Sequence, residues 1–190
     1  MIPALRTETR ILGPEDAGAL ASVFHSRGKL MLRPKSERQR ALAERFPAML
    51  AKDCEAWGTF IGLELQAFCI FYPWREMPFS TLVLIQSRPS PGPVSFARNG
   101  LAPCLDAALE SLEARGYSHI VCRRIVDPRW RRDALLKHAG RLGDYTFTVA
   151  ELIKAGATAR WERFNRAVLD SRPVEHDTAI VIGAKPDGPP

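Results

Sequence analysis

The residues best suited to chemistry lie where an apolar segment passes through a loop into a helix. Phe79–Ser87 is rich in β-branched and aliphatic residues and predicts a mostly buried strand, which the prolines and glycine of 89–93 bring to an end. A helix is expected from Gly100 onward. Backbone N–H groups in the first turn of a helix have no partner within the helix and lie at the positive end of its dipole. This junction can therefore bind an anion such as a phosphate.

The expected helix at 100–115 has a clear apolar face and suitable ends. Leucines recur at helical spacing along one stripe, while acidic and basic residues lie off it, and Gly116 ends the helix. Asn99 is a natural N-cap residue. Pro103 fits only within the first turn, where the missing N–H removes no helix hydrogen bond. The pattern predicts a helix packed on the core with its first turn exposed to a ligand.

Two basic segments that each contain a tryptophan indicate a different chemistry. Arg129, Arg131 and Arg132 surround Trp130, and Arg160 and Arg163 flank Trp161. Guanidinium groups beside large aromatic rings suit phosphate contact combined with base stacking, and they also suit acidic protein surfaces. The alternative is that each tryptophan anchors its helix to a sheet while the arginines remain solvated.

The elements that must hold these residues alternate between strands and helices. Residues 6–12 predict a strand and 13–24 a helix, and Ser36–Ala51 predicts a second helix that Pro47 bends or shortens. Breaks near Gly58, Gly62 and 74–78 divide Cys54–Ser87 into three strands of an antiparallel meander. Five segments are expected after the helix at 100–115. They are a strand at 118–126, a helix at 128–139, a strand at 144–153, a helix at 157–169 and a final strand at 177–182.

Composition limits the class of protein. The chain has 190 residues, of which 46% are hydrophobic and 25% charged, and this predicts one folded domain over 1–184 with a Pro/Gly-rich tail at 185–190. The formal charge of +6 favours a polyanionic partner without specifying one. No apolar run approaches the roughly 20 residues that span a bilayer, and a cytoplasmic location without membrane contact is expected.

Cysteines and histidines show no metal-binding spacing. Cys54, Cys69, Cys104 and Cys122 are far apart and form no CxxC pair, so buried free thiols are expected rather than disulfides or zinc ligands. No metal site is predicted.

The order of elements, together with the junction between Phe79–Ser87 and Gly100, resembles the GNAT acyltransferase superfamily over most of the chain. The resemblance implies an α/β (α+β) fold with a mixed, mainly antiparallel seven-stranded sheet flanked by helices. That sheet would be splayed between its fourth and fifth strands. The helix at 157–169, before the last strand, is an addition to the usual plan of the family.

The same resemblance implies that acyl-CoA, with acetyl-CoA as the expected cofactor, lies in the splay with its pyrophosphate on the first turn of the helix. The family's phosphate loop has Arg or Gln, two further residues, Gly, any residue, and Gly or Ala. Gly100-Leu101-Ala102 fits the second half, but Ala97 occupies the Arg/Gln position and the nearest guanidinium is that of Arg98, so the loop is degenerate. The implied cofactor-binding residues are Ile85, Ser87, Arg98, Asn99, Gly100, Leu101 and Ala102.

Acetyl transfer to an amine needs a base for the amine proton and an acid for the departing thiolate. In the family a tyrosine on the helix after the fifth strand supplies the acid. Here His138 lies closest to that position and Tyr145 lies beyond it, and a solvent-facing helix histidine is the alternative account of His138. Glu55 and Glu64 are candidate bases, or equally ordinary edge and turn charges.

Two functions follow. The first is acyl-CoA-dependent N-acyltransfer, in which acetyl moves to an amine acceptor. The second is a catalytically inactive GNAT-like binding or assembly module, for example in a phage particle, that contacts nucleic acid or acidic protein through the basic Arg/Trp surface.

Overall fold

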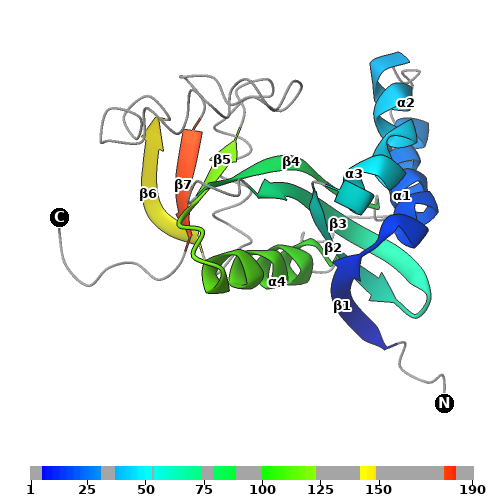
Figure 1. Ribbon diagram of the computed structural model, residues 1–190. Coiled ribbons are helices and arrows are strands. Elements are labelled where there is room, and N and C mark those ends of the chain that lie inside the picture. Colours follow the sequence, from blue (N-terminus) through cyan, green and yellow to red (C-terminus); the bar gives the residue numbers. More distant parts are fainter. Residues whose placement is uncertain are drawn as a thin grey trace. The chain divides into compact units, whose positions relative to one another are not determined.

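A computed structural model describes residues 6–30, 37–52, 54–73, 79–88, 100–122, 142–148 and 178–182 (Figure 1). The expected helices at 128–139 and 157–169, and the tail at 185–190, lie outside these ranges. Within them, no helix has both the length and the apolar character needed to cross a membrane.

The contacts divide the chain into two compact units. The first comprises residues 1–71 and 84–108, and the second comprises 72–83 and 109–190. Strand β4 (Phe79–Ser87) and helix α4 (Leu101–Ala114) each contribute residues to both units.

The first unit contains an antiparallel arrangement of strands (Figure 1). Strand β1 (Thr7–Leu12) pairs with β2 (Glu55–Ile61), and β2 pairs with β3 (Glu64–Pro73), both antiparallel. The β2–β3 turn contains Gly62 with φ of 62°, a left-handed conformation that glycine adopts without steric cost. Strand β4 follows β3 in the hydrogen-bonded order of the sheet. The three strands predicted within Cys54–Ser87 are therefore confirmed.

Gly58 does not break the chain as predicted, because it lies inside β2. A Cβ built on it would come within 2.6 Å of Leu65 Cδ1 and 2.9 Å of Leu12 Cδ2. Glycine is present at this position because two buried leucine side chains occupy the space above the strand, rather than because the backbone turns.

The helices of the first unit pack through aromatic rings. A 3₁₀ turn at Pro14–Asp16 leads into α1 (Ala17–Leu30), followed by α2 (Glu37–Glu44) and α3 (Phe46–Lys52). The helix predicted at Ser36–Ala51 is therefore two helices, and Pro47 lies in the first turn of the second, where a missing N–H is tolerated. Phe46 of α3 contacts Phe24 of α1 and Phe68 of β3 edge to face, with centroids 5.6 and 6.3 Å apart. These contacts place α1 and α3 on the Phe68 face of β3.

An ion pair fixes the passage from β1 into α1. Arg10 donates to both carboxylate oxygens of Asp16 at 2.8 Å, and Asp16 also accepts from the backbone N–H of Gly13 at 3.0 Å. These hydrogen bonds, with that of Arg10 largest, lower the pKa of Asp16 below its ordinary value. The Arg10 guanidinium also lies 4.5 Å from the centroid of the Phe60 ring.

In the second unit, strands pair in the order β4-β5-β7-β6. Strand β5 (His119–Cys122) is parallel to β4 from Phe79 to Thr81, whereas β7 (Thr178–Ile182) is antiparallel to both β5 and β6 (Leu142–Thr148). Combined with the antiparallel strands of the first unit, this parallel pair makes the sheet mixed and mainly antiparallel, as the family resemblance implied.

Candidate active site

The end of β4 presents alternate residues to opposite faces of the sheet. The Gln86 Nε2 group lies 3.3 Å from the carbonyl oxygens of both Val23 and Phe24 in α1, and Arg88 donates to Ser22 of α1. Gln86 and Arg88 therefore face α1. Successive side chains in a strand point to opposite faces, so Ser87 points away from α1.

Helix α4 covers the face to which Ser87 points. Phe68 of β3 packs toward α1 and α3, so its neighbour Cys69 points to the other face, where its thiol donates to the Cys104 carbonyl of α4 at 3.5 Å. Ser87 and the beginning of α4 therefore lie on the same face of the sheet within the first unit.

The Ser87 side chain is buried without a hydrogen-bond partner in the described part of the chain. It is 2% exposed. A buried hydroxyl with no partner costs about 1–3 kcal/mol, and such groups commonly mark a place where a ligand or water completes the structure. Its neighbour Ile85 is half-buried and shares its face, so the strand end presents one apolar and one polar side chain.

The turn into α4 is fixed by Gly100. Its φ is +73°, and a Cβ added to it would lie 2.9 Å from both Cβ and Cγ2 of Thr59 in β2. Thr59 is fully buried, and its hydroxyl lies 3.1 Å from that of Thr9 in β1. Only glycine fits both the left-handed backbone and this close approach.

Helix α4 begins at Leu101, and the Gly100 carbonyl accepts its first hydrogen bond from Cys104 N–H at 3.4 Å. Gly100 therefore occupies the N-cap position that the sequence assigned to Asn99, which lies outside the described residues. Pro103 is in the first turn, as predicted, and its ring removes one donor. The N–H groups of Gly100, Leu101 and Ala102 have no partner within the helix. Leu101 is buried and Ala102 is half-buried, so the core anchors this turn at its first residue.

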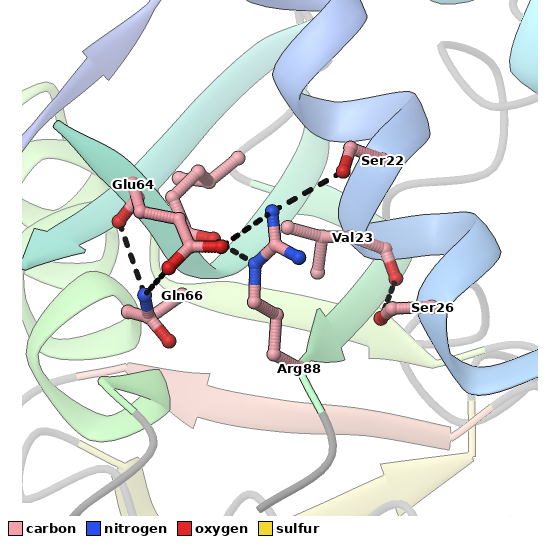
Figure 2. Close-up of polar contacts among 7 residues, drawn as sticks. Ser22, Val23, Ser26, Glu64, Gln66 and Arg88 are labelled. Atoms are coloured by element: carbon pink, nitrogen blue, oxygen red, sulfur yellow. Dashed lines mark hydrogen bonds and ion pairs between the residues drawn. The ribbon is translucent and has the colours of Figure 1, made fainter. Parts of the chain in front are cut away.

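A polar network holds Arg88, the residue that follows β4 (Figure 2). Arg88 Nε donates to the Leu65 carbonyl at 2.7 Å, and Nη2 donates to Ser22 Oγ at 3.2 Å and lies 3.3 Å from a Glu64 carboxylate oxygen. The Arg88 backbone N–H donates to the Gln66 carbonyl at 2.7 Å. One residue therefore links the end of β4 to the beginning of β3 and to the middle of α1.

The thiols beneath α4 are structural. Cys69 and Cys104 are fully buried, and Cys104 donates to the Leu101 carbonyl at 3.2 Å. Burial raises the pKa of the Cys69 thiol well above its ordinary value, which keeps it protonated and unreactive. Cys54, Cys69 and Cys104 carry thiols rather than disulfides; Cys69 and Cys104 are buried, as predicted, whereas Cys54 is half-buried.

Glu55, a predicted base, lies at the start of β2 and accepts a hydrogen bond from Trp57 Nε1 at 2.6 Å. It is on the same face as Thr59, four residues earlier in the strand, which separates the two by about 13 Å along β2. Glu64, the other candidate base, lies at the start of β3 and contacts Arg88 and Gln66. Tyr145 lies in β6 of the second unit, and only its backbone is described.

The remaining predicted site residues lie outside the described ranges. These are His138, Arg98, Asn99, Arg129, Trp130, Arg131, Arg132, Arg160 and Arg163. Sequence reasoning missed Arg88, Gln86 and Thr59. Arg88 follows the apolar strand directly, but nothing in the sequence signals that its partners are backbone carbonyls and a helix hydroxyl.

Comparison with known proteins supports the fold from structure rather than from sequence. No family model matches the chain, and no curated protein matches it. Among solved structures, a putative GNAT-family acetyltransferase from Desulfovibrio desulfuricans aligns with a TM-score of 0.56 at 12% identity, covering 93% of this chain and 97% of that one.

Two further solved structures contain coenzyme A. The PaiA N-acetyltransferase of Thermoplasma acidophilum aligns with a TM-score of 0.56 at 12% identity, over 95% of this chain and all of that one (100%). The N-acetylglutamate synthase of Neisseria gonorrhoeae, which also holds N-acetyl-glutamate, aligns with a TM-score of 0.54 at 11% identity, over 94% of this chain and 35% of that one. The chain therefore has the mixed α/β fold of the GNAT acetyltransferases, as the sequence resemblance implied.

Proposed function

We propose that this protein is an acyl-CoA-dependent N-acyltransferase of divergent GNAT type, with acetyl-CoA as the donor and an amine as the acceptor. The observation that carries the proposal is the geometry around Gly100. A left-handed glycine packed on Thr59 begins α4, and the Ser87 hydroxyl, which has no partner among the described residues, lies on the same face of the sheet. The likeness to CoA-bound GNAT structures supports the same assignment.

Each predicted cofactor-binding residue that the structure describes has a proposed role in binding acetyl-CoA. The N–H groups of Gly100, Leu101 and Ala102 donate to phosphate oxygens, while Ile85 contacts the apolar part of the donor and Ser87 hydrogen-bonds one of its polar groups. Arg98 and Asn99 belong to the same predicted set. When bound, acetyl-CoA supplies an acetyl group as a thioester.

The proton transfers remain predictions. Glu55 is the candidate to take the proton of the attacking amine, and His138 or Tyr145 the candidate to protonate the departing thiolate. A glutamate already hydrogen-bonded by Trp57 would keep its orientation during that transfer.

Calorimetric titration with acetyl-CoA tests the proposal, with dephospho-CoA as a probe of the phosphate contacts. We expect micromolar affinity and at least a tenfold loss in Gly100→Asp, because the carboxylate both clashes with Thr59 and repels phosphate. Gly116→Asp is the matched control, since Gly116 also has positive φ (+85°) but follows the other end of α4, where no atom of the described residues lies within 4 Å of an added Cβ. Equal affinity in the two variants, or no binding by the unaltered chain, refutes the proposal.

Ser87→Ala adds an independent test with opposite effects on stability and binding. Removal of a buried hydroxyl that lacks a partner raises the stability of the unliganded protein by up to about 1 kcal/mol, whereas affinity for acetyl-CoA falls about three- to tenfold. A loss of stability would mean that the hydroxyl has a structural partner.

The incomplete phosphate loop and the net charge of +6 favour one alternative, a non-catalytic module that binds a polyanion. Strongly salt-dependent binding of nucleic acid without affinity for acetyl-CoA would support it.

A further inference from the structure

We propose that Arg88 is a positioning residue for the acyl-CoA site, acting through Ser87 and the end of β4. This inference rests on the proposed function. Arg88 contacts no residue of the α4 turn in the described part of the chain. Its contacts are with β3 and α1, on the face of β4 opposite the site.

The contacts of Arg88 require a guanidinium. Its Nε donates to the Leu65 carbonyl at 2.7 Å, while Nη2, on the same rigid plane, lies 3.2 Å from Ser22 Oγ and 3.3 Å from the Glu64 carboxylate. Lysine keeps the charge, but its single nitrogen cannot take the places of both Nε and Nη2, so it cannot reproduce this pair of contacts. The geometry of these hydrogen bonds, rather than the charge of Arg88, therefore holds the strand.

The Glu64 contact contributes least to this arrangement. The Glu64 side chain is 62% exposed, against 25% for Arg88, and an exposed ion pair at this separation adds little. The two bonds at 2.7 Å, from Arg88 N and Nε to backbone carbonyls of β3, carry most of the constraint. They fix both the position of the strand along β3 and its rotation about its own axis.

That rotation decides where Ser87 points. Gln86 and Arg88 are hydrogen-bonded on the α1 face, one on each side of Ser87, so the hydroxyl between them is held toward α4. Without the hydrogen bond from the Arg88 side chain to Ser22, only the hydrogen bonds of Gln86 remain, among the described residues, between the end of the strand and α1. Arg88 should therefore influence binding only while Ser87 has a hydroxyl to position.

A double-mutant cycle on the full chain tests this dependence. Acetyl-CoA affinity is measured by calorimetry for the unaltered chain, Arg88→Lys, Ser87→Ala and the double variant. We expect Arg88→Lys to weaken binding about tenfold when Ser87 is present and less than threefold when Ser87 is replaced by alanine. Glu64→Gln should change affinity less than twofold. Arg115→Lys is a matched control, because Arg115 Nε also donates to a backbone carbonyl, that of Ser111 in the last turn of α4, at 3.2 Å.

The outcomes separate this inference from the proposed function. An equal loss on Arg88→Lys in both backgrounds would show a general effect on folding and overturn the inference, as would a loss in Glu64→Gln as large as that in Arg88→Lys. Unchanged affinity in Arg88→Lys would overturn it while leaving the proposed function intact. No binding by the unaltered chain would overturn both.

Discussion

Gly100→Ala is the substitution for which the structure gives the sharpest expectation. Two costs combine at this position. An alanine at φ of +73° carries a conformational penalty of about 1–2 kcal/mol. Its Cβ would also lie 2.9 Å from Thr59 Cβ and Cγ2, closer than van der Waals contact allows. Because Thr59 is fully buried and its hydroxyl is hydrogen-bonded to Thr9, it cannot move aside cheaply.

Gly116→Ala isolates the second cost. Gly116 has φ of +85°, but within the described part of the chain no atom lies within 4 Å of the position that a Cβ would occupy, so alanine there meets only the conformational penalty. Overpacking a closed site typically adds about 1–3 kcal/mol. We therefore expect Gly116→Ala to lower the free energy of unfolding by about 1–2 kcal/mol and Gly100→Ala to lower it by about 2–5 kcal/mol.

Urea unfolding, followed by both circular dichroism and tryptophan fluorescence, measures the difference between the two variants. Thr59→Ser, which removes Cγ2, should restore part of the stability lost in Gly100→Ala. If Gly100→Ala costs no more than Gly116→Ala, the close packing of the α4 turn on β2 is not what requires glycine, and the description of this turn is wrong.

Three other perturbations have defined outcomes. Asp16→Asn should lower the free energy of unfolding by about 1–3 kcal/mol near neutral pH, measured by urea unfolding, because it removes a charged partner of Arg10 and Gly13. Folding lowers the pKa of Asp16, so the stabilisation from its carboxylate is present above the ordinary pKa of 3.8 and is lost as pH falls through the lower pKa of the folded state. The stability of the variant should therefore fall less steeply with pH in acid. Burial lowers the pKa of His119 from 6.5, so the stability that its neutral form contributes should be full above that pH and decline below it. A His119→Gln variant whose stability shows the same decline between pH 6.5 and 5 would show that His119 does not cause it. Leu105→Ala, at a fully buried position of α4, should cost about 2–5 kcal/mol in thermal or urea unfolding, and a cost below 1 kcal/mol would mean that the helix face is not packed as described.

The sequence predicted the strands and helices that depend on local pattern. The leucine stripe of 101–112 and the β-branched run at 79–87 correspond closely to α4 and β4, because apolar periodicity records which face is buried. Gly58 was predicted wrongly because the reason for a glycine there lies in neighbouring strands and not in the local pattern. A glycine required by side chains from two neighbouring strands looks the same in sequence as a glycine required by a turn.

Less of the candidate site than of the fold could be predicted from the sequence. Gly100 and Ser87 were predicted from family resemblance and position, but the contact of Gly100 with Thr59 joins residues 41 positions apart and leaves no local pattern. Arg88 was missed for a similar reason, since its two shortest hydrogen bonds are to backbone carbonyls, which every residue carries. Resemblance indicates which positions matter, whereas the reason for each residue type depends on long-range contacts.

The alternation at the end of β4 has a consequence for how this chain can vary in length. Insertion of one residue within the strand before Gln86 would exchange the two faces, turning the hydroxyl of Ser87 toward α1 and the amide of Gln86 toward α4. Insertion of two residues would restore the facing but shift the guanidinium of Arg88 about 7 Å beyond its carbonyl on β3. Natural relatives of this protein should therefore keep the length of β4 constant and differ in length in their loops.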